Sequence, residues 1–289
     1  MLGLVQRAES NRFAEDLRRA TAAMRSAEAL LVAAGAGMGV DSGLPDFRGQ
    51  AGFWRAYPAL KRLGVSFEEM AQPGWFWDDP SLAWGFYGHR LDLYRRTDPH
   101  EGFARLLDLG KSKPEGYFVF TSNVDGQFQK AGFAEERIVE CHGSIHHLQC
   151  VAPCSEAIWD AATTTVAVDE AACRAQEPLP HCSRCGRLAR PNILMFGDWG
   201  WVGNRADEQR SRLETWLKQL AQKSARLVIV ELGAGEAIPT VRYTCERIAQ
   251  RFQATLIRIN PRDASVPAGH VGLAMGAAEG VRRTAGDRS

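Results

Sequence analysis

The sequence predicts an α/β fold, in which a doubly wound, Rossmann-like parallel sheet carries a second, smaller zinc-binding and helical domain. Short apolar runs alternate along the chain with stretches of helical periodicity, which is typical of parallel strands buried on both faces. A glycine-rich turn follows the first run directly, as in nucleotide-binding units of this architecture. Two cysteine pairs lie in a middle segment that breaks the alternation, which indicates an inserted metal site.

Length and composition agree with this fold class. The chain has 289 residues, of which 45% are hydrophobic, enough for one large core and a smaller one. Its net charge of +1 gives no reason to expect binding to nucleic acid or to an anionic membrane. No apolar run reaches the length of a membrane span, and the N-terminus lacks the features of a signal peptide. We therefore expect a cytoplasmic protein whose seven cysteines do not form a disulfide framework.

The expected elements follow one another in a regular order. Residues 9–28 carry Phe13, Leu17, Ala20 and Met24 on one face, the pattern of an amphipathic helix that covers the sheet. The predicted strands of the parallel sheet are residues 29–34, 117–121, 138–141, 193–196, 227–232 and 255–259.

Two segments do not fit the alternation. Residues 50–100 are rich in Trp and Phe and are cut by prolines, which predicts a helical insertion. Residues 146–189 carry the paired cysteines and show little periodicity. We assign both segments to the smaller domain and residues 9–49, 101–145 and 190–281 to the larger, nucleotide-binding domain, with a ligand cleft between the two.

The stretch from Gly35 to Arg48 is the most informative in the chain. It follows the strand 29–34 without a linker, and its glycines let backbone N–H groups approach a pyrophosphate at the start of a helix. Because Gly43 and Pro45 are unfavourable inside a helix, we expect the neighbouring acid, aromatic and base to contact the ligand. The alternative is a tight strand-to-helix turn without a ligand. The predicted nucleotide-binding residues of this stretch are Gly35, Ala36, Gly37, Asp46, Phe47 and Arg48.

The paired cysteines predict a structural metal site. Cys150 and Cys154 form the first pair, and Cys182 and Cys185 form the second. Four thiolates complete a zinc tetrahedron and leave no open position for catalysis. The alternative is a set of free buried cysteines, and Cys173 could compete as a ligand although it has no paired neighbour.

Polar residues follow two further predicted strands. Asn123 and Asp125 come after residues 117–121, where their side chains could hydrogen-bond an amide or a ribose, or could form an Asx turn. His142 follows the strand 138–141, and we expect its side chain to project into the cleft. An imidazole near its ordinary pKa can take a proton at neutral pH, although a lone histidine is more often structural.

Taken together, these blocks resemble the signature of the sirtuin family. The glycine turn runs into Ser42-Gly43-Leu44-Pro45-Asp46-Phe47-Arg48, where the family has Ser/Ala-Gly-Ile-Pro-Asp-Phe-Arg. The blocks at 121–126, 140–143 and 190–197 and the cysteine pairs recur in family order, so that the resemblance covers nearly the whole chain. Ordered recurrence of that many motifs is far more specific than any one of them.

The resemblance implies an NAD site with assigned roles, and a structural zinc on the two cysteine pairs. His142 would be the general base, and Asn123 and Asp125 would line the nicotinamide pocket. The sequence departs from the family at Ser122, where Gln is usual, and at Ala234, where the family has a hydroxyl residue, and at 127–128, where Gln-Phe replaces Leu-His. The implied catalytic residues are His142 and Asn123, and the further implied cofactor-binding residues are Ser122, Asn123, Val124, Asp125, Gly233, Ala234, Gly235 and Asn260.

The activity that the resemblance implies is NAD-dependent protein-lysine deacylation. The acyl group would pass from a lysine of a protein substrate to ADP-ribose, nicotinamide would be released, and NAD would be consumed as a co-substrate. Two alternatives stay open: a protein mono-ADP-ribosyltransferase or NAD glycohydrolase in the same cleft, and a non-catalytic NAD-binding module. A dehydrogenase is disfavoured, because no acid follows the second strand in the usual place.

A candidate acyl-group receptor lies in the helical insertion. Tyr87 and Arg90 are three residues apart and would share a helix face, where a phenol beside a guanidinium can bind a carboxylate. They resemble the Tyr-x-x-Arg pair of the sirtuins that remove succinyl, malonyl or glutaryl groups. The alternative is that Tyr87 packs against Trp84 while Arg90 pairs with a surface acid such as Asp92.

Overall fold

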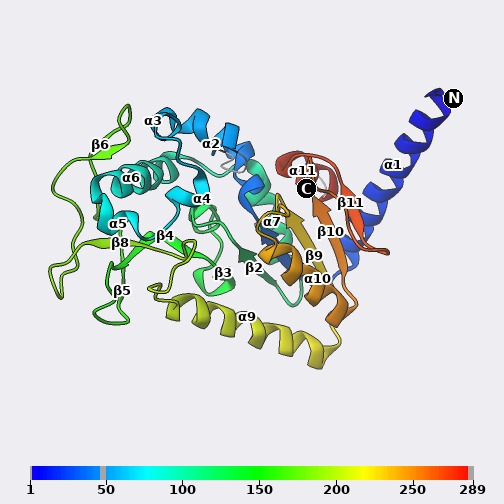
Figure 1. The fold of residues 1–289 in the computed structure, drawn as a ribbon. Helices are drawn as coiled ribbons and strands as arrows, with labels where there is room; N and C mark the ends of the chain where they lie inside the picture. The colour runs from blue at the N-terminus through cyan, green and yellow to red at the C-terminus, as the bar shows by residue number, and fades with distance from the viewer. Residues whose placement is uncertain (1, 46–49, 286–289) are drawn as a thin grey trace.

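Six parallel strands form the central sheet, in the order β11-β10-β9-β1-β2-β3 (Figure 1). The structure is a computed structural model that describes residues 2–45 and 50–285. Five of the strands match predicted ones, whereas the short edge strand β11 is absent from the prediction. The strands are β1 (Ala29–Ala34), β2 (Tyr117–Thr121), β3 (Ile138–Glu140), β9 (Leu227–Leu232), β10 (Thr255–Ile259) and β11 (Val271–Leu273).

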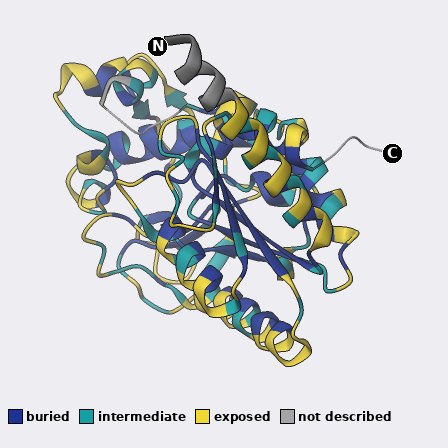
Figure 2. Ribbon diagram, turned by 90° about the vertical axis from the view of Figure 1, so that its right-hand side faces the viewer, coloured by how far each residue is buried: buried dark blue, intermediate teal, exposed yellow. Residues whose placement is uncertain are grey.

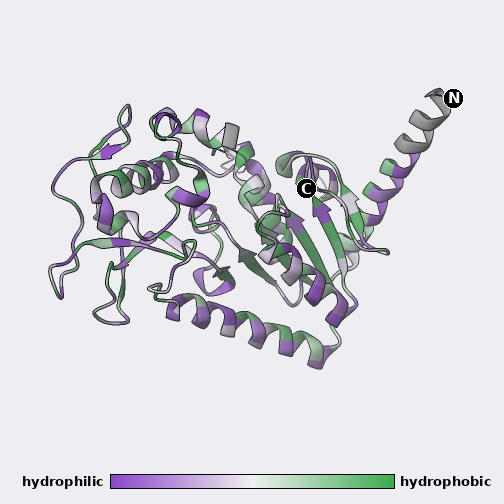
Figure 3. Cartoon of the chain, viewed as in Figure 1, coloured by the Kyte–Doolittle hydropathy of each residue, from purple (hydrophilic) through white to green (hydrophobic). Residues whose placement is uncertain are grey.

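Helices cover both faces of this sheet. Leu30 and Val32 of β1 belong to one core, while Ala29 and Leu31 belong to the other, so this strand is buried on both sides. Figure 2 shows the strands as buried and Figure 3 shows them as apolar, with polar residues on the outer helix faces. The predicted doubly wound α/β fold is therefore confirmed. The first core is covered by α1 (Leu2–Ser26), α7 (Glu101–Lys111) and α11 (Ala277–Thr284), and the second by α9 (Asn204–Lys223) and α10 (Thr240–Phe252).

A smaller domain lies at one end of the sheet, beyond β3 (Figure 1). It combines helices from one insertion with a three-stranded antiparallel sheet, β5-β4-β8, and a two-stranded one, β6-β7. The indole Nε1 of Trp84 donates to the Ala189 carbonyl at 3.0 Å and links the two parts across a shared aromatic core. Its elements are α2 (Gln50–Ala56), α3 (Pro58–Arg62), α4 (Phe67–Met70), α5 (Trp75–Asp78), α6 (Pro80–Arg96), β4 (Gly143–Cys150), β5 (Ile158–Asp160), β6 (Val168–Asp169), β7 (Arg174–Ala175) and β8 (Ala189–Ile193).

Two expectations about elements and one about the domain boundaries need correction. β4 and β8 pair with each other in the sheet of the smaller domain, so residues 143–145 and 190–193, assigned above to the larger domain, belong to the smaller one. The predicted parallel strand 193–196 is wrong, because β8 ends at Ile193 and pairs antiparallel with β4 instead. The backbone N–H groups of Leu194 and Phe196 donate to carbonyls of other loops, and these two residues are each 38% exposed, whereas Ile193 and Met195 are buried in the core of the smaller domain. The first helix begins at Leu2 and ends at Ser26 rather than spanning 9–28. No helix within the described ranges combines the length and the hydropathy that crossing a lipid bilayer requires.

Candidate functional site

The carboxyl ends of three neighbouring strands bring the predicted polar residues together. Gly35 follows β1, Asn123 lies two residues beyond β2, and His142 lies two residues beyond β3. The side-chain Nδ2 of Asn123 donates to the Gly35 carbonyl at 3.0 Å, which ties the polar loop to the glycine loop. Ligands of doubly wound sheets bind at this edge, outside the carboxyl ends of the strands.

Two glycine-bearing loops touch backbone to backbone at the same edge. The Gly37 N–H donates to the Gly233 carbonyl at 3.1 Å, and a Cβ on Gly37 would lie only 2.7 Å from the Gly233 Cα. Gly233 has a φ of +59°, a left-handed conformation that favours glycine. Neither position has room for a side chain, so the glycines are required where the loop after β1 meets the loop after β9.

Asp125 is buried beside Asn123. One of its carboxylate oxygens accepts from the Gln127 N–H at 3.0 Å, so the Asx turn that the sequence left open is present. Asp125 is only 8% exposed, and this burial raises the pKa of its carboxyl group to about 6. The His146 ring nitrogen Nε2 lies 2.9 Å from the Asp125 carbonyl oxygen and fixes the same loop from the β4 side.

His142 is partly buried at the end of β3. Burial lowers the pKa of its imidazole below the ordinary value of 6.5, and a hydrogen bond to the Ser122 backbone opposes this in part. The ring is therefore neutral at pH 7 and is oriented by the loop that follows β2. A neutral, oriented imidazole can accept a proton from a donor within hydrogen-bond distance of its free nitrogen.

Asn260 joins the loops that follow β9 and β10. Its Nδ2 donates to the Ala234 carbonyl at 2.9 Å, while its Oδ1 accepts from the N–H groups of Arg262 and Asp263 at 2.9 and 3.1 Å. All of its side-chain polar atoms thus have partners within these loops. The amide is only 4% exposed and holds the backbone of the Ala234 loop in place.

The remaining predicted nucleotide-binding residues divide into two groups. Gly235 and Val124 are buried in the loops already described, and Ser122 and Ala36 are partly exposed there. Asp46, Phe47 and Arg48 lie outside the residues that the structure describes.

Tyr87 and Arg90 lie in the interior of the smaller domain, on one face of α6. Tyr87 stacks on Phe76 with ring centroids 5.6 Å apart, and burial raises its pKa to about 12. The Arg90 guanidinium donates through Nε and Nη2 to the Tyr94 hydroxyl at 3.0 and 2.8 Å. Asp92, which the sequence offered as a partner for Arg90, pairs with Arg96 instead.

The four paired cysteines converge. The ligand atoms of Cys150, Cys154, Cys182 and Cys185 all lie within 4.8 Å of one another, with two sulfur pairs at 3.6 and 3.7 Å. Tetrahedral ligands about 2.3 Å from a zinc ion are separated by about 3.8 Å, so the set fits this metal. Cys173 is buried elsewhere, against Gly85 of α6. The predicted zinc site is a closed, structural one.

Sequence reasoning missed several residues that shape the site. Gln127, which the sequence marked only as a departure, donates from Nε2 to the Tyr94 and Thr97 carbonyls at 3.4 and 3.2 Å. It thereby caps the C-terminal end of α6 and joins this helix to the loop that carries Asp125. Glu231 and Arg258 were also missed, although a charge inside an apolar strand run was a signal that could have identified them.

Comparison with known proteins agrees with this geometry. The Sir2 family model matches residues 35–214. An NAD-dependent protein deacylase of Aquifex aeolicus is 31% identical over 234 residues, which are 80% of this chain and 83% of the relative. NAD-dependent protein deacylase 2 of Pyrobaculum aerophilum is 29% identical over 246 residues and 84% of each chain.

A solved structure shows the same fold. The crystal structure of a Sir2 homolog–NAD complex superposes with a TM-score of 0.68 at 22% identity, covering 93% of this chain and 92% of that one. The order of the strands, the two glycine loops, the four-cysteine cluster and these matches lead to one conclusion. This chain belongs to the Sir2 family.

Proposed function

We propose that this chain is an NAD-dependent protein-lysine deacylase, with His142 as its general base. The observation that carries the proposal is the meeting of a neutral histidine, a buried asparagine and two glycine loops at one edge of a parallel sheet. Membership of the Sir2 family supports it, since the relatives above are named NAD-dependent protein deacylases.

The glycine loops suit the pyrophosphate and adenosine half of NAD. Ala36 is the first residue of a short 3-10 turn (Ala36–Met38), where the backbone N–H has no acceptor within the turn. Gly235 and Asn260 lie on the β9–β10 side of the sheet, whereas Asn123 and His142 lie on the β2–β3 side. A dinucleotide lying along the strand ends would therefore place its nicotinamide end near Asn123.

His142 and Asp125 suit the chemistry at that end. NAD supplies a ribosyl carbon that accepts the acyl oxygen as nicotinamide leaves. The neutral His142 ring would take a proton from a ribose hydroxyl, and its hydrogen bond to the Ser122 backbone would hold the ring in place. With a pKa of about 6, Asp125 is mostly ionised at pH 7.5, where its negative charge would favour positive charge developing on the sugar.

Replacing the base tests the proposal. We expect His142→Ala to abolish nicotinamide release from NAD and an acetyl-lysine peptide while ADP-ribose still binds within about threefold, since the imidazole acts on the proton rather than on the phosphates. His181→Ala, an exposed histidine of the cysteine-bearing segment, is the control and should keep wild-type activity.

Three results would contradict the proposal. Nicotinamide release by the wild-type protein without any acyl peptide would favour the glycohydrolase or ADP-ribosyltransferase alternative. Tight NAD binding without turnover on any acyl peptide would favour a binding module. Full activity of His142→Ala would exclude this histidine as the base.

The preferred acyl group is proposed to end in a carboxylate, such as succinyl or malonyl. The Arg90 guanidinium is almost fully buried between aromatic rings, with Phe86 and Tyr94 centroids 5.1 and 5.4 Å from its central carbon. Burial raises the pKa of Asp125, and the positive charge of Arg90 opposes that rise in part, so Arg90 lies within electrostatic reach of the proposed nicotinamide end. A carboxylate is the group that a guanidinium in such surroundings binds most strongly.

Substituting the guanidinium tests this preference separately. We expect Arg90→Met to lose at least tenfold in kcat/KM for a succinyl-lysine peptide and to change little for the acetyl-lysine peptide, since only the former loses a charged hydrogen bond. Arg96→Met is the control on the same helix, because Arg96 is exposed and pairs only with Asp92 among the ion pairs of the described chain. Equal losses on both peptides would show that Arg90 is structural.

A further inference from the structure

Opposite charges are buried where the carboxyl ends of β9 and β10 lie side by side. Glu231 and Arg258 are register partners on these strands and are 0% and 1% exposed. The Arg258 guanidinium donates to both Glu231 carboxylate oxygens, at 2.6 and 2.9 Å, and its Nη2 also donates to Glu246 of α10 at 2.9 Å. Their neighbours on the same sheet face, such as Ile229 and Leu256, are apolar core residues.

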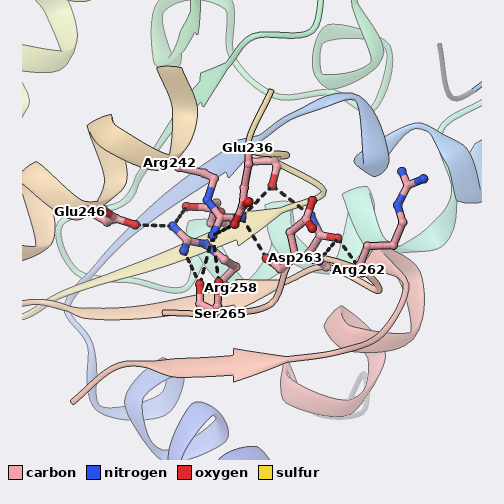
Figure 4. A network of polar contacts seen from close by, with 10 residues as sticks. Glu236, Arg242, Glu246, Arg258, Arg262, Asp263 and Ser265 are labelled. Atoms are coloured by element: carbon pink, nitrogen blue, oxygen red, sulfur yellow. Dashed lines mark hydrogen bonds and ion pairs between the residues drawn. The ribbon is translucent and has the colours of Figure 1, made fainter. Parts of the chain in front are cut away.

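A second arginine joins this pair from the first turn of α10. Arg242 is 6% exposed and donates to the Asp263 carbonyl at 2.9 Å and the Ser265 carbonyl at 3.1 Å. Arg258 donates to the same Ser265 carbonyl, so that two guanidinium groups converge on one backbone oxygen (Figure 4). We call Glu231, Arg242 and Arg258 the arginine cluster.

The arginine cluster is not explained by stability. Removing a carboxylate and a guanidinium from water costs several kcal/mol per ion, and apolar residues of similar volume often serve a core equally well or better. Buried arginines whose hydrogen bonds go to loop carbonyls do, however, fix where those loops lie. The carbonyls at Asp263 and Ser265 belong to the loop between β10 and β11, which begins at Asn260.

A continuous set of contacts leads from the arginine cluster to the glycine loops. Arg242 Nη1 lies 3.5 Å from the Ala234 carbonyl, which also accepts from the Asn260 side chain. Gly233, the neighbour of Ala234, is hydrogen-bonded to Gly37 of the first glycine loop. Every contact in this set involves the backbone of a loop, bonded either to a buried side chain or to the backbone of the next loop. A shift at the arginine cluster would therefore move the Ala234 loop.

We infer that Arg242 and Arg258, held by Glu231, are positioning residues for the adenosine and pyrophosphate half of the NAD site. The inference rests on the proposed function and adds a specific consequence. The arginine cluster is formed by residues of β9, β10 and α10, whereas Asn123 and His142 follow β2 and β3, on the far side of β1. Loss of the cluster should therefore weaken binding of the ADP-ribose part and leave the catalytic step nearly unchanged.

Arg242→Met is the substitution that tests this with least risk to folding, because Glu231 and Arg258 still pair with each other. We expect its Kd for ADP-ribose and its KM for NAD to rise about tenfold, the scale of one hydrogen bond from a charged donor. We expect kcat at saturating NAD and KM for the acyl peptide to stay within twofold. Arg247→Met, an exposed arginine of the same helix, is the matched control and should bind ADP-ribose like the wild type.

A second variant covers the case in which Arg242→Met does not fold. In Glu231→Gln with Arg258→Met, both buried charges are removed together, so neither is left unpaired, and the same rise in the Kd for ADP-ribose is expected. Wild-type affinity for ADP-ribose in a folded variant, or parallel losses in kcat and in peptide KM, would overturn the inference. Failure of the wild-type protein to bind ADP-ribose would instead overturn the proposed function, so the two failures are distinguishable.

Discussion

Gly37→Ala probes the contact between the two glycine loops. An added Cβ would lie 2.7 Å from the Gly233 Cα and 3.0 Å from its carbonyl oxygen. Ordinary contact begins at 3.4 Å, so the loops must separate by about 0.7 Å, because both partners are backbone and cannot rotate away. That movement also stretches the 3.1 Å hydrogen bond from the Gly37 N–H to the Gly233 carbonyl out of bonding range.

The expected loss follows from this displacement. A misplacement of about 1 Å in a binding site can cost 100-fold in rate, so we expect kcat/KM for NAD to fall between about tenfold and 100-fold, or about 1.4 to 2.7 kcal/mol. Overpacking of this kind destabilises a protein by about 1–3 kcal/mol. Isothermal titration with ADP-ribose and steady-state kinetics on the acyl peptide measure the first effect, and thermal unfolding measures the second.

Gly74→Ala is the matched control for this substitution. Gly74 has a right-handed helical conformation, and the nearest atom to an added Cβ, on Asp78, lies at 3.7 Å, which is ordinary contact. It should therefore bind ADP-ribose like the wild type and unfold at the same temperature or slightly higher. If Gly37→Ala bound ADP-ribose as tightly as this control, the contact between the loops would not set the shape of the site.

Three further outcomes can be measured. Asp198→Asn should destabilise the protein by about 3–5 kcal/mol in urea unfolding, because the buried Arg190 guanidinium loses its counter-charge. This guanidinium is 1% exposed and donates to both carboxylate oxygens of Asp198. Substitution of the exposed Asp207 by Asn is the control, and an equal loss of stability in both variants would contradict the role of burial. Burial raises the pKa of Asp125 from 3.8 to about 6. At a pH between these two pKa values, the carboxyl group is therefore protonated in the folded chain and ionised in the unfolded chain. The stability advantage of the wild type over Asp125→Asn should thus fall by about 2 kcal/mol as pH rises from 4 to 6. Taking the difference between the two proteins removes the opposite contribution of histidines such as His142, whose pKa burial lowers. A difference that does not change with pH would refute the assignment. Chelation of zinc should release amide protection in residues 150–189 before the central sheet, and simultaneous loss across the whole chain would show that the zinc site holds both domains.

Much of the fold was predictable because its signals are local. Largely apolar runs identified five of the six parallel strands, since burial on both faces leaves no regular polar alternation. The edge strand β11 has only three residues, Val271–Leu273, which is too short for a pattern. The prediction for residues 193–196 failed for a different reason: their composition resembles a buried strand, but the backbone N–H groups of Leu194 and Phe196 donate to loop carbonyls, and both residues are partly exposed.

The candidate site was predictable only in part. Residues after strand ends could be named from the chain alone, because strands and turns are local features. Which strands are neighbours is a long-range property, so the bond from Asn123 to Gly35 and the one from His142 to the Ser122 backbone emerge only in three dimensions. The assignment of catalytic and binding roles remains a prediction.

By itself, the sequence determined the fold class, the four metal-binding cysteines and the positions of the glycine turns, since periodicity and ligand spacing are written along one chain. Only the tertiary structure decided what the buried charges do. Glu231 and Arg258 are 27 residues apart and each interrupts an apolar run, yet strand pairing brings them into a bidentate ion pair. The physical reason is that the cost of burying a charge depends on what lies beside it, and neighbours across a parallel sheet are chosen by topology rather than by sequence distance.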